Sequence, residues 1–179
     1  MADIPLNMMP LPNRSLLIEQ AHCIATFDST QTTSGKEWRD ASLFIRDHRI
    51  EWVGPADELP TQWAAEHATN VANGRGETLN ARGHLVTPGL VNTHHHMYQS
   101  LTRAIPTVQD AELFGWLQGL YPIWAGLTPE MVHVSTQVAM AELLLSGCTT
   151  SSDHLYIYPN GVRLDDSIHA AQEIGMRFV

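Results

Sequence analysis

The chain has 179 residues, 44% of them hydrophobic, and a formal net charge of −9 from 10 Lys+Arg against 19 Asp+Glu. This composition supports a packed core in one or two domains, and the acidic balance argues against nucleic acid and anionic membrane surfaces as partners. The two cysteines are far apart in the sequence, which argues against a disulfide framework. The N-terminus is not basic, which argues against a signal peptide, and no apolar run reaches the roughly 18 residues of a membrane span. Together these features favour the cytoplasm.

The first half of the chain has the pattern of a β-rich unit. Apolar and β-branched runs alternate with short polar stretches, and two such runs flank the polar residues 47–49 as in a hairpin. The expected elements are, in order, a loose lead-in (1–13), a strand (15–28), a polar loop (29–38), a hairpin (41–54), a short helix that starts near Pro60 (57–68), a polar turn (81–83) and two strands on either side of Pro88-Gly89, the second of which ends at the histidines.

The second half alternates between strand and helix patterns. The clearest helix begins after Thr128, an N-cap followed by a proline at the first helical position, and ends at Gly147. Five apolar residues recur along it with helical spacing: Met131, Val134, Val138, Ala141 and Leu145. The other expected elements are helical pieces (111–127), a strand that runs into a loop (148–156), a second helix (164–175) and the start of a strand (176–179). This alternation predicts parallel strands joined by crossover helices.

The stretch "GLVNTHHHMYQS" carries three consecutive histidines after an apolar run, Leu90-Val91, that we expect to be buried. Successive side chains of a strand point to opposite faces, so His94 and His96 share a face and His95 points away. Two imidazoles on one face can bind the same divalent ion at about 2.0–2.1 Å. The pair also falls at the C-terminal end of a predicted parallel strand, where ligand sites gather in such folds. A catalytic zinc needs three or more protein ligands, so the pair is an incomplete site.

The alternative for the triplet is a solvated histidine loop. Cys148 is interpreted as a core thiol, because it lies at a strand start. The remaining histidines are interpreted as surface or helix-face residues: His22, His48, His67, His84, His133 and His169.

Candidate substrate-binding residues come from three places in the sequence. Gln99 follows the histidines, and its amide can donate to and accept from a heterocyclic amide, although an exposed loop glutamine is the alternative. Trp116 suits stacking on a flat substrate or packing in a core. Asp153, His154 and Tyr156 follow the next predicted strand, at the position equivalent to the triplet, and of these we select His154 as a substrate contact.

The residues "VTPGLVNTHHHMYQSLTRA" resemble the first barrel strand of the amidohydrolase superfamily, whose mark is Pro-Gly, two apolar residues, Asn or Asp, one variable residue, and then His-x-His. The resemblance implies that His94 and His96 are metal ligands and that His95 is the spacer. The preceding β-rich region resembles the small β-sandwich half-domain of that superfamily, with His48 in a turn where the family often has glycine. The stretch from Leu113 to Gly161 is similar to 8-oxoguanine deaminases and, more distantly, to guanine deaminases and s-triazine hydrolases, in which a glutamine placed like Gln99 contacts the ring.

The resemblance implies an α/β fold in which residues 1–86 form the N-terminal β-sandwich portion. Residues 87–179 would form the first βα units of a (β/α)8 TIM-type barrel that is incomplete in this chain. It further implies one divalent metal per subunit, most often zinc with iron as the alternative, a small heterocyclic substrate and a homo-oligomer. The reaction would be the hydrolytic deamination of 8-oxoguanine to urate and ammonia.

The family pattern also requires a later metal-binding His, a further His, a proton-shuttling Glu and a metal-binding Asp, and none has a place in this sequence. A full barrel takes about 250 residues. We therefore expect the N-terminal part of a longer enzyme, inactive by itself, with no catalytic residue of its own. The alternatives are an s-triazine or guanine aminohydrolase and, in another class, a non-catalytic metal-binding module.

Overall fold

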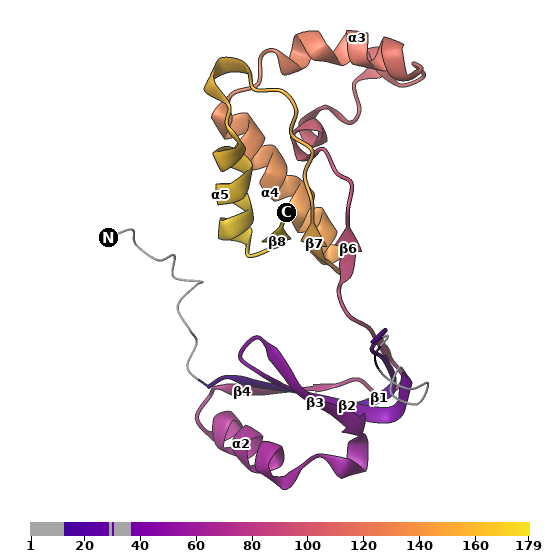
Figure 1. Cartoon of the computed structure of the whole chain (residues 1–179), viewed down its shortest axis with the longest axis vertical. Helices are drawn as coiled ribbons and strands as arrows, with labels where there is room; N and C mark the ends of the chain where they lie inside the picture. The colour runs from indigo at the N-terminus through magenta and orange to yellow at the C-terminus, as the bar shows by residue number, and fades with distance from the viewer. Residues whose placement is uncertain (1–12, 29, 31–36) are drawn as a thin grey trace, which may run out of the picture. The chain divides into compact units, whose positions relative to one another are not determined.

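The chain folds as two units, Met1–Pro88 and Gly89–Val179 (Figure 1). The structure is a computed structural model that describes residues 13–28, 30 and 37–179. The expected lead-in over 1–13 lies almost wholly outside the described residues, and so does most of the loop expected over 29–38. No described helix has the length and apolarity needed to cross a membrane.

A mixed five-stranded sheet forms the first unit, with strand order β3-β2-β1-β4 and with β5 also paired to β1. β1 pairs antiparallel with β2 and parallel with β4 and β5, and β2 pairs antiparallel with β3. Helix α2 packs against β1 and β4 (Figure 1). The elements are β1 (Ser15–Ala25), β2 (Glu37–Arg46), β3 (Arg49–Pro55), the 3-10 turn η2 (Ala56–Glu58), α2 (Thr61–Ala72), β4 (Gly76–Asn80) and β5 (Leu85–Val86).

The predicted hairpin forms around a turn in which Asp47 has a φ of 53°. Its first strand begins at Glu37, inside the predicted loop, because β2 continues to pair with β1 as far as Ala25. Strand β4 was not expected, since its sequence "GETLN" lacks apolar alternation and its residues are largely exposed. Its backbone pairing with β1 makes it a strand nonetheless.

His67, interpreted as a surface or helix-face residue, lies on a face of α2 that is buried and not exposed at the surface. Its side chain projects from α2 to the sheet, with Nδ1 2.8 Å from the Ser15 hydroxyl of β1 and Nε2 2.9 Å from the Thr78 hydroxyl of β4. Burial lowers the pKa of His67, an effect that the Glu19 carboxylate partly opposes. Hydroxyl partners on β1 and β4 satisfy both ring nitrogens, and this is what allows a polar ring to lie beneath the helix.

Three parallel strands in the order β6-β7-β8 form the sheet of the second unit. α3 and α4 lie between β6 and β7 in the chain, and α5 lies between β7 and β8. The prediction of parallel strands with crossover helices is therefore confirmed, and α4 and α5 lie side by side (Figure 1). The elements are β6 (Leu90–Asn92), the 3-10 turns η3 (Met97–Thr102) and η4 (Pro106–Val108), α3 (Leu113–Trp124), α4 (Pro129–Leu145), β7 (Cys148–Ser151), the 3-10 turn η5 (Pro159–Gly161), α5 (Leu164–Ile174) and β8 (Arg177–Phe178).

Helix α4 begins as predicted, because the Thr128 hydroxyl accepts a hydrogen bond from the Met131 backbone N–H at 3.3 Å. The buried face of α4 differs from the stripe of apolar residues whose spacing predicted the helix. Most of that stripe is exposed, and the buried residues are Val132, Ser135, Thr136, Ala139 and Met140. The small polar residues pack because α5 lies close against this face.

The expectation that Leu90 and Val91 are buried is also wrong. They are 60% and 64% exposed. Among the described strands β6 pairs only with β7, so it is an edge strand.

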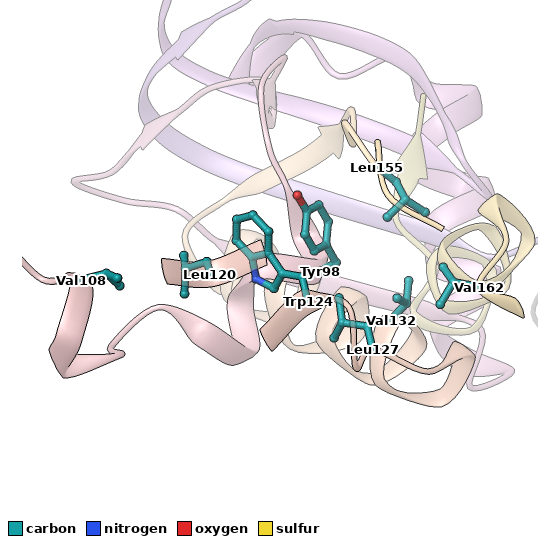
Figure 2. Close-up of a cluster of buried hydrophobic side chains, with 8 residues drawn as sticks. All are labelled: Tyr98, Val108, Leu120, Trp124, Leu127, Val132, Leu155 and Val162. Atoms are coloured by element: carbon teal, nitrogen blue, oxygen red, sulfur yellow. The ribbon is translucent and has the colours of Figure 1, made fainter. Parts of the chain in front are cut away.

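Two hydrophobic clusters hold the segment that follows the histidines. In the first, the Tyr98 and Trp124 rings meet edge to face with centroids 5.3 Å apart (Figure 2). The Trp124 indole N–H donates a hydrogen bond to the Thr102 hydroxyl at 3.0 Å. In the second, Met97 packs with a buried Cys148, which confirms the core thiol. Met97 and Tyr98 are both fully buried, so the backbone just after His96 has little freedom.

Candidate metal centre

The pair His94 and His96 lies just past the end of β6, where the Asn92 side chain accepts a hydrogen bond from the His94 backbone N–H at 3.0 Å. The two Nε2 atoms lie 3.3 Å apart, with the rings edge to face. Two Zn–N bonds of about 2.0–2.1 Å spanning that separation subtend about 104–111°, which brackets the tetrahedral angle. The separation of the two nitrogens therefore matches that of two ligands of one zinc ion.

The ring of His96 is held in a defined orientation. Its Nδ1 lies 2.8 Å from the backbone carbonyl oxygen of His154, and since a carbonyl can only accept, Nδ1 must carry the proton. Nε2 then keeps its lone pair, as a metal ligand requires. This is the usual arrangement by which an acceptor beyond the ring fixes the tautomer of a metal-binding histidine.

His95 does not contribute to this pair. Its ring is half-buried, and its Nδ1 has no hydrogen-bond partner among the described residues. Burial lowers the pKa of His95, and the Asp153 carboxylate opposes this effect. Burial likewise raises the pKa of Asp153, opposed chiefly by the hydrogen bond that the carboxylate accepts from the Met97 N–H.

His154 lies beside both members of the pair. Its ring stacks on His94, with centroids 4.8 Å apart and planes 22° apart, and its centroid is 5.6 Å from that of His96. Across residues 13–28, 30 and 37–179, no group of three or more His, Cys, Asp or Glu side chains is placed to hold a metal ion. The structure thus brings together two candidate ligands with a third imidazole next to them.

Gln99 joins the same neighbourhood through two tyrosines. Its amide nitrogen donates to the Tyr98 hydroxyl at 3.1 Å and to the Tyr156 hydroxyl at 3.3 Å, and the Tyr156 ring meets the His96 ring edge to face at 5.3 Å. Burial, reinforced by the Tyr156 hydroxyl, raises the pKa of Tyr98, so it stays a neutral phenol. Sequence reasoning did not select either tyrosine as a site residue. Each follows a histidine of the site by two residues, Tyr98 after His96 and Tyr156 after His154, and this spacing could have indicated them.

Trp116 is not part of this group of rings. It is half-buried and packs on the first hydrophobic cluster, where its ring meets Trp124 at 5.3 Å. Its link to the histidines runs through Trp124 and Tyr98.

Comparisons of the sequence and of the structure with known proteins both find similar deaminases and hydrolases. The chain is 46% identical over 137 residues to an 8-oxoguanine deaminase of Pseudomonas aeruginosa, covering 75% of this chain and 28% of that protein. It is 34% identical over 155 residues to a hydroxydechloroatrazine ethylaminohydrolase of Pseudomonas sp. strain ADP, covering 83% and 31%. Atrazine chlorohydrolase from Arthrobacter aurescens TC1, solved with zinc, superposes with a TM-score of 0.73 at 28% identity over 91% of this chain and 34% of that one.

These likenesses imply a TIM-barrel-type fold and a divalent metal. The chain spans about a third of the length of the relatives it matches. The profile of the Amidohydrolase family matches residues 85–179, more than half of the chain, and this range includes strands β6 to β8, the histidine pair and helices α3 to α5. The chain belongs to the Amidohydrolase family.

Proposed function

We propose that this chain supplies two metal ligands and part of the substrate pocket to a hydrolytic deaminase of heterocyclic amines. The observation that carries the proposal is the His94–His96 pair, whose Nε2 atoms converge at 3.3 Å at the C-terminal end of a parallel strand. In barrel enzymes this end of the strands forms the active site. One divalent metal, most often zinc with iron as the alternative, fits the two imidazoles.

A metal bound there supplies Lewis acidity and brings the pKa of water toward neutrality. The chain's own residues have positioning tasks. His96 presents its Nε2 lone pair, the Nε2 atom of His94 lies 3.3 Å from it, and the His154 carbonyl holds the His96 ring in place. The deamination adds water to the ring carbon that bears the exocyclic amine and releases ammonia, so 8-oxoguanine would give urate.

For the substrate pocket we propose Gln99 and His154 as contacts. The Gln99 amide is held by two tyrosine hydroxyls beside the His96 ring, and the His154 ring lies parallel to His94. Trp116 was also a candidate contact. Its packing on Trp124 supports a role in holding Tyr98 more directly than a role in touching substrate.

8-Oxoguanine is the first choice of substrate because the relative of that name is 46% identical over 137 residues. An s-triazine is the second candidate, favoured by the relative that acts as a hydroxydechloroatrazine ethylaminohydrolase. Guanine completes the set to be tested.

We further propose that residues 1–86 form part of a β-sandwich and that residues 87–179 begin the barrel. The remaining ligands, a His and an Asp, the further His and the proton-shuttling Glu would come from outside these 179 residues, and the complete enzyme would be a homo-oligomer. The 179-residue chain by itself should then release no ammonia from 8-oxoguanine. Clear zinc-dependent turnover by the purified chain would overturn this part of the proposal.

A chimera tests the positive part. This chain replaces the aligned segment of the Pseudomonas aeruginosa deaminase, and ammonia release is measured with 8-oxoguanine, guanine and a hydroxy-triazine. We expect zinc-dependent release with 8-oxoguanine, loss of release in the His94→Ala chimera, and retained release in the His95→Ala chimera as the matched control. A folded chimera that binds zinc but deaminates none of the three compounds would contradict the proposed function.

A further inference from the structure

Three hydrogen bonds join residues 94–97, here called the histidine segment, to the residues that follow β7. The His154 backbone N–H donates to the His95 carbonyl at 2.8 Å, and the His96 Nδ1 donates to the His154 carbonyl at 2.8 Å. The third runs from the Met97 backbone N–H to the Asp153 carboxylate at 2.9 Å. Of the three acceptors only that of Asp153 is a side chain, so a substitution can remove it without touching the backbone.

Helix α5 supports the Asp153 carboxylate from the other side. The fully buried Ser167 hydroxyl donates to its second oxygen at 3.4 Å, and the fully buried Thr136 hydroxyl of α4 donates to Ser167 at 3.4 Å. These two contacts are long and individually weak. They nevertheless orient the carboxylate toward Met97 and connect the histidine segment with both crossover helices.

We propose that Asp153 is a positioning residue for the His94–His96 pair. This inference rests on the proposed function, because it treats the pair as a metal site. Met97 is fully buried, so without the carboxylate its N–H loses its partner away from water, and the backbone next to His96 moves to recover one. The His96 ring then moves away from the His154 carbonyl, whose hydrogen bond sets the tautomer of His96. It also moves relative to the Nε2 atom of His94.

The first test needs no metal. In the 179-residue chain at pH 8, long-range nitrogen–proton NMR spectra of the histidine rings report the tautomer of His96. We expect the Nδ1–H form in the wild type and in Asp153→Asn, whose amide oxygen still accepts from Met97, and an averaged signal in Asp153→Ala. Asp165→Ala removes an exposed carboxylate from α5 and is the matched control.

The second test is a Zn²⁺ titration of the same samples. Partners that orient metal ligands are worth about 10–100-fold in affinity, so Asp153→Ala should bind Zn²⁺ about tenfold or more weakly, with Asp153→Asn within about threefold of wild type. If Asp153→Ala keeps both the His96 tautomer and the wild-type affinity, the positioning role is wrong.

Two further results separate the remaining cases. If Asp153→Ala does not fold, Asp153→Leu takes its place, because it removes the acceptor of the Met97 N–H while filling the space of the carboxylate, and an unchanged His96 signal there contradicts the proposal. If Zn²⁺ leaves the His94 and His96 signals of the wild type unchanged, the proposed metal site is wrong. The metal-free comparison of His96 tautomers still tests whether Asp153 positions the His96 ring.

Discussion

The Nε2 atoms of His94 and His96 lie 3.3 Å apart, whereas the Nδ1 atom of His95, the residue between them, is buried without a hydrogen-bond partner among the described residues. The two predicted ligands thus lie within reach of one ion, as the proposed metal site requires. The two nitrogens converge although β6 ends at Asn92 and both histidines lie beyond it.

The histidine triplet should respond unequally to alanine substitution. We expect His94→Ala and His96→Ala to weaken Zn²⁺ binding by about tenfold or more, since each removes one of two ligands, and His95→Ala to change it by less than about threefold. Calorimetric Zn²⁺ titration of the four chains measures this. Three similar, small effects would instead indicate a solvated histidine cluster.

Replacing Gln99 by leucine should affect substrate binding more than turnover. The substitution removes the amide that donates to the Tyr98 and Tyr156 hydroxyls, while both tyrosine rings keep their contacts with His96. In the chimera described above, we expect KM for 8-oxoguanine to rise about tenfold, the worth of one hydrogen bond of roughly 1.4 kcal/mol, with kcat changed less. Gln118→Leu, at an exposed position on α3, is the control. An unchanged KM would remove Gln99 from the pocket.

The second unit should depend on Trp124 for its stability. Its side chain is fully buried among aromatic rings and donates to Thr102. Trp124→Ala should therefore lower the free energy of unfolding by about 3–5 kcal/mol. Trp116→Ala, at a half-buried position, should cost about half as much. Urea unfolding of both variants gives the comparison, and equal losses would show that Trp116 is as deeply packed as Trp124.

The buried His67 should make the first unit less stable in acid. Its pKa is lowered in the folded state, so below the ordinary histidine pKa of about 6.5 the unfolded chain takes up a proton that folded His67 does not. The stabilising effect of the neutral ring is therefore complete above about pH 6.5 and is lost as the pH falls toward the lowered value.

Urea unfolding at pH 7.5 and pH 5.5 tests this for the wild type and for His67→Gln. We expect the stability difference between the two chains to shrink at the lower pH, since glutamine does not titrate. His22→Gln, an exposed histidine of β1, should show no such change relative to the wild type. A wild-type advantage over His67→Gln that is equal at both pH values would contradict the assignment.

Local patterns in the sequence determined much of this protein. Helical spacing and the Thr128 cap predicted α4, alternation of strands and helices predicted the parallel sheet, and two-residue parity separated His94 and His96 from His95. Each of these follows from backbone geometry within a few residues, which is why a linear pattern suffices to predict it.

Only the tertiary structure decided which faces are buried and which distant residues meet. The predicted apolar stripe of α4 is largely exposed, and His67 is buried, because burial depends on what packs against an element and not on its own periodicity. The orientation of His96 comes from a carbonyl 58 residues away. No local pattern encodes such a contact, since it exists only after β7 has paired with β6 and brought the two strand ends together.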